Sequence, residues 1–97
     1  MVQLFFFPPA EKYFKKLRDK ELKQKYKTAL EAICDDPFTG SEKTGDLSGI
    51  FGYDVYHNRT NYEIAYRVYK LTDGSKIVVI MAGTRENFWN TLKRYIK

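Results

Sequence analysis

The stretch from Gly52 to Arg85 constrains the fold most, because its residues alternate like those of three successive strands. It begins GYDVYH, turns through Asn58–Asn61 and continues YEIAYRVYKLTDGSKIVVIMAGTR. The pair Asp73-Gly74 predicts a tight turn in which both residues adopt positive φ. Residues 76–81, with the sequence KIVVIM, are nearly all apolar, which is typical of an interior strand covered on both faces.

The same alternation divides the side chains between the two faces of the predicted sheet. In the first strand one face carries Tyr53, Val55 and His57, and the other carries Asp54 and Tyr56. In the next strand the more apolar face, expected to meet the helices, carries Tyr62, Ile64, Tyr66 and Val68. The opposite face, expected to line a solvent groove, carries Glu63, Ala65, Arg67 and Tyr69.

A strand and two helices are predicted before this stretch. Residues 2–7 are rich in aromatic and branched side chains and predict a strand, which ends at two prolines because proline cannot donate to a ladder. Residues 11–18 predict a short helix, and Asp19 is suited to cap a second helix that Pro37 ends. The second helix has one apolar face, which consists of Leu22, Tyr26, Ala29, Leu30 and Ile33.

The remaining segments complete one α+β domain that spans residues 1–97. Residues 38–49 are rich in Gly, Ser and Thr and predict a loop, and Thr84 is suited to cap a last helix over 85–96. The predicted order is strand, helix, helix, strand, strand, strand, helix. We therefore expect a helical hairpin on a mostly antiparallel sheet, followed by a C-terminal helix. A chain of 97 residues suffices for one core but not for two.

The net charge of +5 indicates a polyanionic partner, either nucleic acid or an acidic protein, with a solvated lysine surface as the alternative. Cys34 is the one cysteine, which excludes an internal disulfide and a thiolate metal cluster and suits a reducing cytoplasm. We expect it to be a half-buried structural thiol. The apolar start lacks a basic leader and a cleavage site, and no apolar run is long enough to span a membrane, so we expect neither export nor a membrane partner.

Polar side chains gather where the first of the three strands ends. His57, the one histidine of the chain, is followed by Asn58, Arg59 and Asn61. Histidine transfers protons near neutral pH, and arginine offers a fixed charge and a bidentate fork for phosphate. This strand end therefore has the residue types that a phosphate-handling site requires.

The order of elements and several motifs resemble the RelE/ParE superfamily of toxins from bacterial toxin–antitoxin pairs. The motifs are DPFTG, DLSG, the spacing G-Y-x-x-x-H that ends at His57, EIAYRVY, and AGTR with an aromatic residue four positions later. The resemblance covers almost the whole chain. The G-Y-x-x-x-H spacing, the following Asn61-Tyr62 pair and the KLTD segment look most like the YafQ branch.

This resemblance implies a cytoplasmic, ribosome-dependent messenger RNA endonuclease that a partner antitoxin neutralises. His57 matches the family's strand-end histidine, and Asn61 stands where the YafQ branch has an aspartate. Tyr62 and Trp89 match aromatic positions, and Arg85 stands where that branch has a histidine and other RelE-like toxins an arginine. Asp54 departs from the basic residue that is common after the Gly-Tyr pair.

RNA cleavage of this kind needs no metal and no cofactor, because the 2′-hydroxyl of the substrate is the nucleophile. On this basis His57, Arg85 and Asn61 are the candidate catalytic residues, with His57 as acid or base and Arg85 holding the phosphate. The candidate substrate-binding residues are Arg59, Tyr62, Arg67 and Trp89. Trp89 is a base-stacking platform or a core aromatic. Glu63 is either a base or the salt-bridge partner of Arg67.

Two classes of function remain open on the sequence. The first is the messenger RNA interferase, whose partners are the ribosome, messenger RNA and the antitoxin. The second is a non-enzymatic inhibitor, either a ParE-like protein that acts on DNA gyrase or an inactive binding module with the toxin fold. For either class we expect an acidic, partly disordered antitoxin segment to bind a basic groove between the sheet and the last helix and to fold there.

Overall fold

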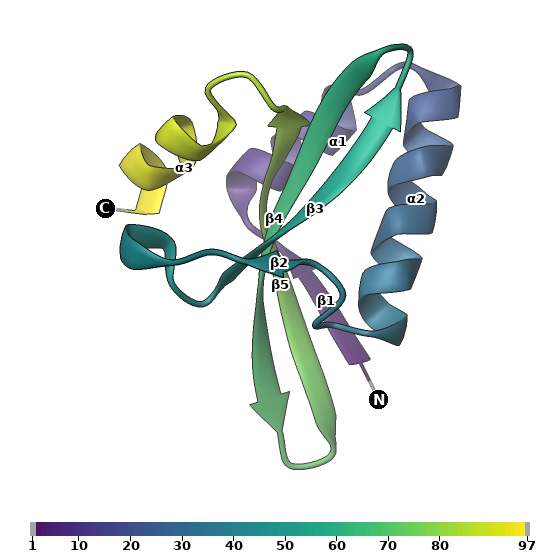
Figure 1. Ribbon diagram of the computed structural model, residues 1–97. Coiled ribbons are helices and arrows are strands. Elements are labelled where there is room, and N and C mark those ends of the chain that lie inside the picture. The colour runs from purple at the N-terminus through teal and green to yellow at the C-terminus, as the bar shows by residue number, and fades with distance from the viewer. Residues whose placement is uncertain (1, 97) are drawn as a thin grey trace.

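The computed structural model describes residues 2–96, and its elements surround a five-stranded sheet with the strand order β1-β5-β4-β3-β2 (Figure 1). The strands are β1 (Val2–Phe6), β2 (Ser41–Glu42), β3 (Ile50–His57), β4 (Thr60–Leu71) and β5 (Gly74–Thr84). β1 pairs with β5 in parallel and the other pairs are antiparallel. This arrangement confirms the predicted α+β fold and its mostly antiparallel sheet.

The two predicted N-terminal helices are present with shifted boundaries. Helix α1 (Pro8–Lys16) begins three residues earlier than expected, because prolines are tolerated in a first helical turn, where the N–H groups have no helical partner. Helix α2 (Lys20–Asp35) has the predicted cap, since the Asp19 carboxylate accepts a hydrogen bond of 3.1 Å from the Leu22 backbone N–H. Both helices lie on one face of the sheet (Figure 1).

The prediction for the start of the last helix is wrong. Helix α3 runs only from Phe88 to Ile96, and Thr84 is the last residue of β5 and not a helix cap. Arg85 therefore lies in a turn outside the helix, where its backbone N–H donates to the Asn61 carbonyl at 2.9 Å. This backbone hydrogen bond continues the pairing between β4 and β5 to their end.

The sheet separates two apolar cores, which confirm how the side chains of β4 divide between its faces and that β5 is covered on both. The core under α1 and α2 includes Tyr26, Ile33, Ile64, Tyr66, Ile77 and Val79. The core under α3 includes Ile50, Ala65, Val78, Ile80, Phe88 and Leu92. β5 is thus covered on both faces, as its apolar sequence predicts. The second face of β4 was expected to line solvent, but α3 covers it at Ala65.

The hairpin turn with two positive-φ residues lies between β3 and β4, and not between β4 and β5 as the sequence predicts. Asn58 and Arg59, between β3 and β4, both have positive φ, at 48° and 61°. At the other turn only Gly74 has positive φ, at 149°, and β5 already begins there, so the expectation for Asp73 is wrong. The β3–β4 turn is therefore the two-residue hairpin whose central residues both have positive φ.

The β4–β5 ladder contains one irregularity, which determines the face of the sheet to which the later side chains of β5 point. Ala65 pairs with Met81 while Tyr66 pairs with Val79, so Ile80 is an extra residue on β5. A bulge of this kind reverses the alternation of side chains beyond it. Ala82 consequently faces α1 and α2, although Ile80, two residues earlier, faces α3.

The segment 38–49, predicted as a loop, contains the short strand β2 and one turn of 3₁₀ helix, Gly45–Leu47. The buried Tyr66 hydroxyl holds the preceding turn, because it donates to the Pro37 carbonyl at 2.8 Å and accepts from the Gly40 N–H at 3.1 Å. Within residues 2–96 no helix is both long and apolar enough to cross a membrane.

Candidate functional site

A carboxyl group with a strongly raised pKa, that of Glu63 in β4, lies on the α3 face directly opposite Asp54 of β3. Glu63 is only 2% exposed. The pKa of Glu63 is raised to about 7, most by burial and then by its hydrogen bond and charge repulsion with Asp54, while Arg85 and Lys43 act in the opposite direction. Glu63 therefore exchanges a proton near neutral pH, as a general acid or base must.

Arg85 is the cation of this cluster. Its Nε lies 3.4 Å from Oε2 of Glu63, and 61% of its side chain is exposed while that of Glu63 is buried. The sequence expectation that Glu63 pairs with Arg67 is thus corrected, because the ion pair joins Glu63 to Arg85 across the β4–β5 ladder. Arg85 presents one side of its guanidinium to a buried carboxylate and the rest to solvent.

Three of the predicted site residues meet in a polar depression beside this ion pair. Arg59, Asn61 and Arg85 line it together with Thr60, Thr84 and Glu86, and its volume is about 390 Å³. The two-residue turn after β3 brings Arg59 there, and the hydrogen bond from the Arg85 backbone to Asn61 joins the two strands. The structure therefore brings these three residues together, while their roles stay predictions.

His57 and Tyr62 lie on the opposite face of the sheet, under α2. His57 is 3% exposed, and its Nε2 lies 3.0 Å from Oδ2 of Asp19. The buried Nδ1 has no hydrogen-bond partner among the described residues. Tyr62 packs its ring edge-on against Tyr26, with centroids 6.1 Å apart. The structure thus separates these two predicted site residues from Arg85.

Asp19 joins the hairpin turn to the start of α2. The backbone N–H of Leu22 and the ring of His57 both hydrogen-bond its carboxylate, and these bonds lower the pKa of Asp19, the first most. The side chain of Lys25 adds a further link, because its ammonium donates to the Tyr56 carbonyl at 3.0 Å. In this setting His57 holds the β3–β4 hairpin against α2.

The other two predicted substrate-binding residues lie along α3. Arg67 shares a depression with Asp46, Lys93, Arg94 and Ile96. The half-buried Trp89 packs on Gly52, where an added Cβ would come within 2.8 Å of the indole ring, so only glycine fits there. The Lys43 ammonium lies 4.3 Å from the centre of the same ring, so a cation already covers one face of Trp89.

Sequence reasoning missed Asp54 and Lys43 as members of the cluster. A signal for Asp54 was present, because a two-residue turn at Asn58–Arg59 requires residue 54 to pair with residue 63. No comparable signal identifies Lys43, which reaches the cluster from a loop. Among the described residues, no group of three or more His, Cys, Asp or Glu side chains could hold a metal ion.

The raised pKa of Glu63 makes the stability of the protein depend on pH. Between the ordinary value of 4.5 and about 7, the native state keeps this proton while the unfolded chain releases it. Stability should therefore fall as the pH rises through this window, and Glu63→Gln should remove that part of the fall. Urea unfolding at a series of pH values measures the effect, with the exposed Glu86→Gln as control. Parallel curves for Glu63→Gln and the native protein would contradict the assignment.

Comparison with known proteins identifies the family. The model of the ParE-like toxins of type II bacterial toxin–antitoxin systems matches residues 4–93. No curated protein sequence matches the chain. The YafQ-like branch stays a prediction.

Solved structures share the fold at low identity. A YoeB/ParE toxin from Agrobacterium tumefaciens is 16% identical with a TM-score of 0.70, over 86% of this chain and 98% of that one. A chain of the intact E. coli RelBE toxin–antitoxin complex is 19% identical with a TM-score of 0.67, over 86% and 95%. A mutant of E. coli toxin RelE in the free state is 19% identical with a TM-score of 0.70, over 94% and 90%. These neighbours confirm the RelE/ParE-like fold, and the family match shows that the chain belongs to the ParE-like toxins of type II bacterial toxin–antitoxin systems.

Proposed function

We propose that this toxin is a messenger RNA interferase that cleaves ribosome-bound transcripts without a metal, with Glu63 as the proton-transfer group and Arg85 as the phosphate clamp. The observation that carries the proposal is the contact between a buried carboxyl group with a pKa of about 7 and an exposed arginine at the mouth of a polar depression. Perturbed carboxyl groups beside a cleft are typical of catalytic sites.

The proposed step is a transesterification within the RNA. The Glu63 carboxylate takes the proton of the 2′-hydroxyl, the 2′-oxygen forms a bond to phosphorus, and the bond from phosphorus to the 5′-oxygen breaks. The products are a 2′,3′-cyclic phosphate and a 5′-hydroxyl, and the 5′-oxygen receives the proton that Glu63 has taken. A carboxyl group with a pKa of about 7 suits this exchange, because it can accept a proton and return it near neutral pH.

Through Arg85, the binding of a substrate phosphate would control access to the Glu63 carboxylate. Its guanidinium now lies against Glu63, but most of the side chain is exposed and free to turn toward a phosphate. A phosphate that draws Arg85 away would uncover the carboxylate and remove the positive charge that opposes its protonation. Substrate binding would thus raise the basicity of Glu63 at the moment when a base is needed.

The earlier assignment of proton transfer to His57 remains a separate hypothesis. In its favour is the match to the family histidine, and against it are the burial of His57 and its contact with Asp19 on the other face of the sheet. Asn61 and Arg59 would orient the phosphate within the depression under either assignment. The two hypotheses therefore differ in which single substitution stops cleavage.

Single-turnover cleavage of ribosome-bound message distinguishes them. Glu63→Gln should lower the rate by about 10²-fold or more, because the isosteric amide cannot accept the proton. Arg85→Ala should lower both rate and binding, and Arg85→Lys should restore binding better than rate because a point charge lacks the planar fork. The native rate should rise with pH as the Glu63 carboxyl group ionises at about 7.

His57→Asn is the matched comparison, and it should keep most of the rate wherever the variant remains folded by circular dichroism. Full activity of folded Glu63→Gln together with loss in His57→Asn would transfer the role to histidine. Intact transcripts accompanied by DNA damage would instead favour the non-enzymatic gyrase inhibitor, the second class that the sequence leaves open.

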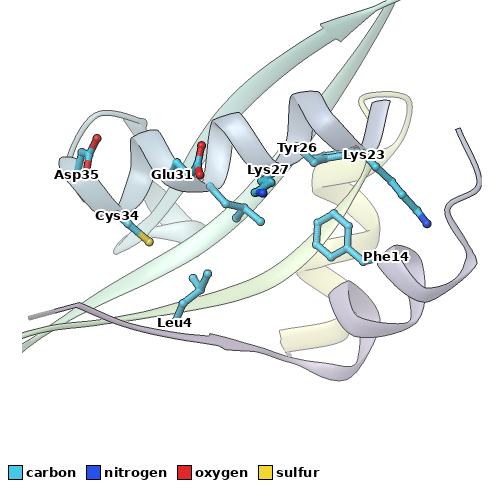
Figure 2. Close-up of a pocket in the computed structure, with 9 residues that line it drawn as sticks. Leu4, Phe14, Lys23, Tyr26, Lys27, Glu31, Cys34 and Asp35 are labelled. Carbon is cyan, nitrogen blue, oxygen red and sulfur yellow. The ribbon is translucent and has the colours of Figure 1, made fainter. Parts of the chain in front are cut away.

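We also propose that an acidic, partly disordered antitoxin neutralises the toxin by laying an amphipathic helix in the groove between α2, α1 and β1. Figure 2 shows Leu4 of β1, Phe14 of α1 and Cys34 of α2 at this groove. Its volume is about 470 Å³, and its charged lining residues are the cations Lys23 and Lys27 and the carboxylates Glu31 and Asp35. An apolar floor beside charges of both signs suits an amphipathic helix whose polar face carries acidic residues toward the two lysines only.

Growth assays test this partner surface. Expression of the toxin alone should stop bacterial growth, and co-expression of the cognate antitoxin should restore it. Leu30→Glu, which places a charge in the groove, should leave the toxin active but no longer neutralised. The comparison variant Lys93→Gln/Arg94→Gln alters the basic depression beside α3, the region where the sequence predicts antitoxin binding. Loss of neutralisation in that variant alone would place the antitoxin beside α3.

A further inference from the structure

We propose that a second depression, beside α1, binds the phosphate backbone of single-stranded RNA. Its volume is about 620 Å³, and three cations line it: Lys12, Lys16 and Arg18. Tyr13 and Ala82 also line it. The proposal rests on the proposed function in taking RNA as the ligand, but it concerns binding at a different place from the Glu63 cluster.

The three cations converge because of the local backbone. Lys12 and Lys16 are one helical turn apart on α1, so they lie on the same side of that helix. Arg18 follows in the short connection between α1 and α2. All three side chains are exposed, so they are free to meet a ligand.

The nearby acidic groups leave this positive charge in place. Among the ion pairs of residues 2–96, none involves Lys12, Lys16 or Arg18. Asp19, next to Arg18, is already bonded to the Leu22 backbone and to His57. Glu11 lines a different depression, together with Phe6 and Phe14. The lining residues of the α1 depression therefore include cations and no carboxylate.

The α1 depression adjoins the proposed catalytic one along the end of β5. Ala82 lines the first and Thr84 lines the second, and these residues are two positions apart on one strand. Residues two apart on a strand point to the same face and are separated by roughly 7 Å. One short RNA strand can therefore contact Arg59 and Arg85 and continue over α1.

Phosphate fits this surface better than an acidic protein does. Lysine is depleted from the cores of protein interfaces, whereas lysine and arginine supply most contacts to nucleic-acid phosphates. The groove of Figure 2, with Leu4, Phe14 and Cys34, offers the apolar anchors that a protein helix requires. The two surfaces thus differ in the chemistry of the partner that each recognises.

The test is the salt dependence of binding to a short fluorescent oligouridylate, measured by anisotropy in the Glu63→Gln background so that the RNA stays intact. Each phosphate contact on a single strand contributes about 0.7 to the slope of log K against log salt. Lys12→Gln/Lys16→Gln/Arg18→Gln should lower that slope by about 2. Between about 50 and 200 mM salt, binding by the parent should weaken about 20-fold more than binding by the triple variant.

The matched control is Lys20→Gln/Lys23→Gln/Lys27→Gln, which removes the same charge from α2. This control should keep the parent slope. An equal fall in both variants would show attraction by net charge alone, and an unchanged slope in the α1 variant would exclude the site. If polyglutamate binds as tightly as the oligouridylate and the α1 substitutions weaken its binding equally, the depression binds an acidic protein instead of RNA. Cleavage of ribosome-bound message by Glu63→Gln would refute the catalytic proposal, whereas the binding proposal depends only on the salt slopes measured with the intact oligouridylate.

Discussion

One extra residue in β5 decides which face of the sheet receives Arg85. Up to Val79 the odd-numbered residues of this strand face α1 and α2, and without the bulge at Ile80 residue 85 would continue in that direction. The bulge reverses the alternation, and Arg85 reaches Glu63 on the α3 face instead. Bulges are frequent next to active sites for this reason, since they redirect a side chain while the ladder continues on either side.

The Glu63 cluster is a place where stability is given up. A buried carboxyl group opposite a second carboxylate is unfavourable when ionised, and the surrounding cations only partly compensate it. Lys43 belongs to this cluster and also covers the ring of Trp89. Because Trp89 packs closely on Gly52, the position of Lys43 is fixed by this packing. Such unfavourable arrangements are expected where function requires them, because the surrounding fold must supply the stability that they remove.

Most of the fold could be predicted from the sequence because periodicity and capping are local signals. Asp19 caps α2, and the two faces of β4 are as the alternation indicates. The start of α3 was missed because Thr84 has the chemistry of a cap but belongs to a strand held by pairing with β4. The site was predicted less well. His57 alternates with Tyr53 and Val55 as expected, and it lies under α2 with them. Its separation from Arg85, however, depends on a bulge that no local pattern of β5 indicates.

The central claim is that Asp54 raises the pKa of the buried Glu63, whose carboxylate pairs with Arg85. Its most direct test is a carbon-13 NMR titration of the glutamate side-chain carboxyl groups. In the native protein the Glu63 signal should titrate with a pKa of about 7, and in Asp54→Asn that pKa should fall because a repelling charge is removed. A Glu63 signal that titrates at the ordinary value of 4.5 in the native protein, unchanged by Asp54→Asn, would contradict the account.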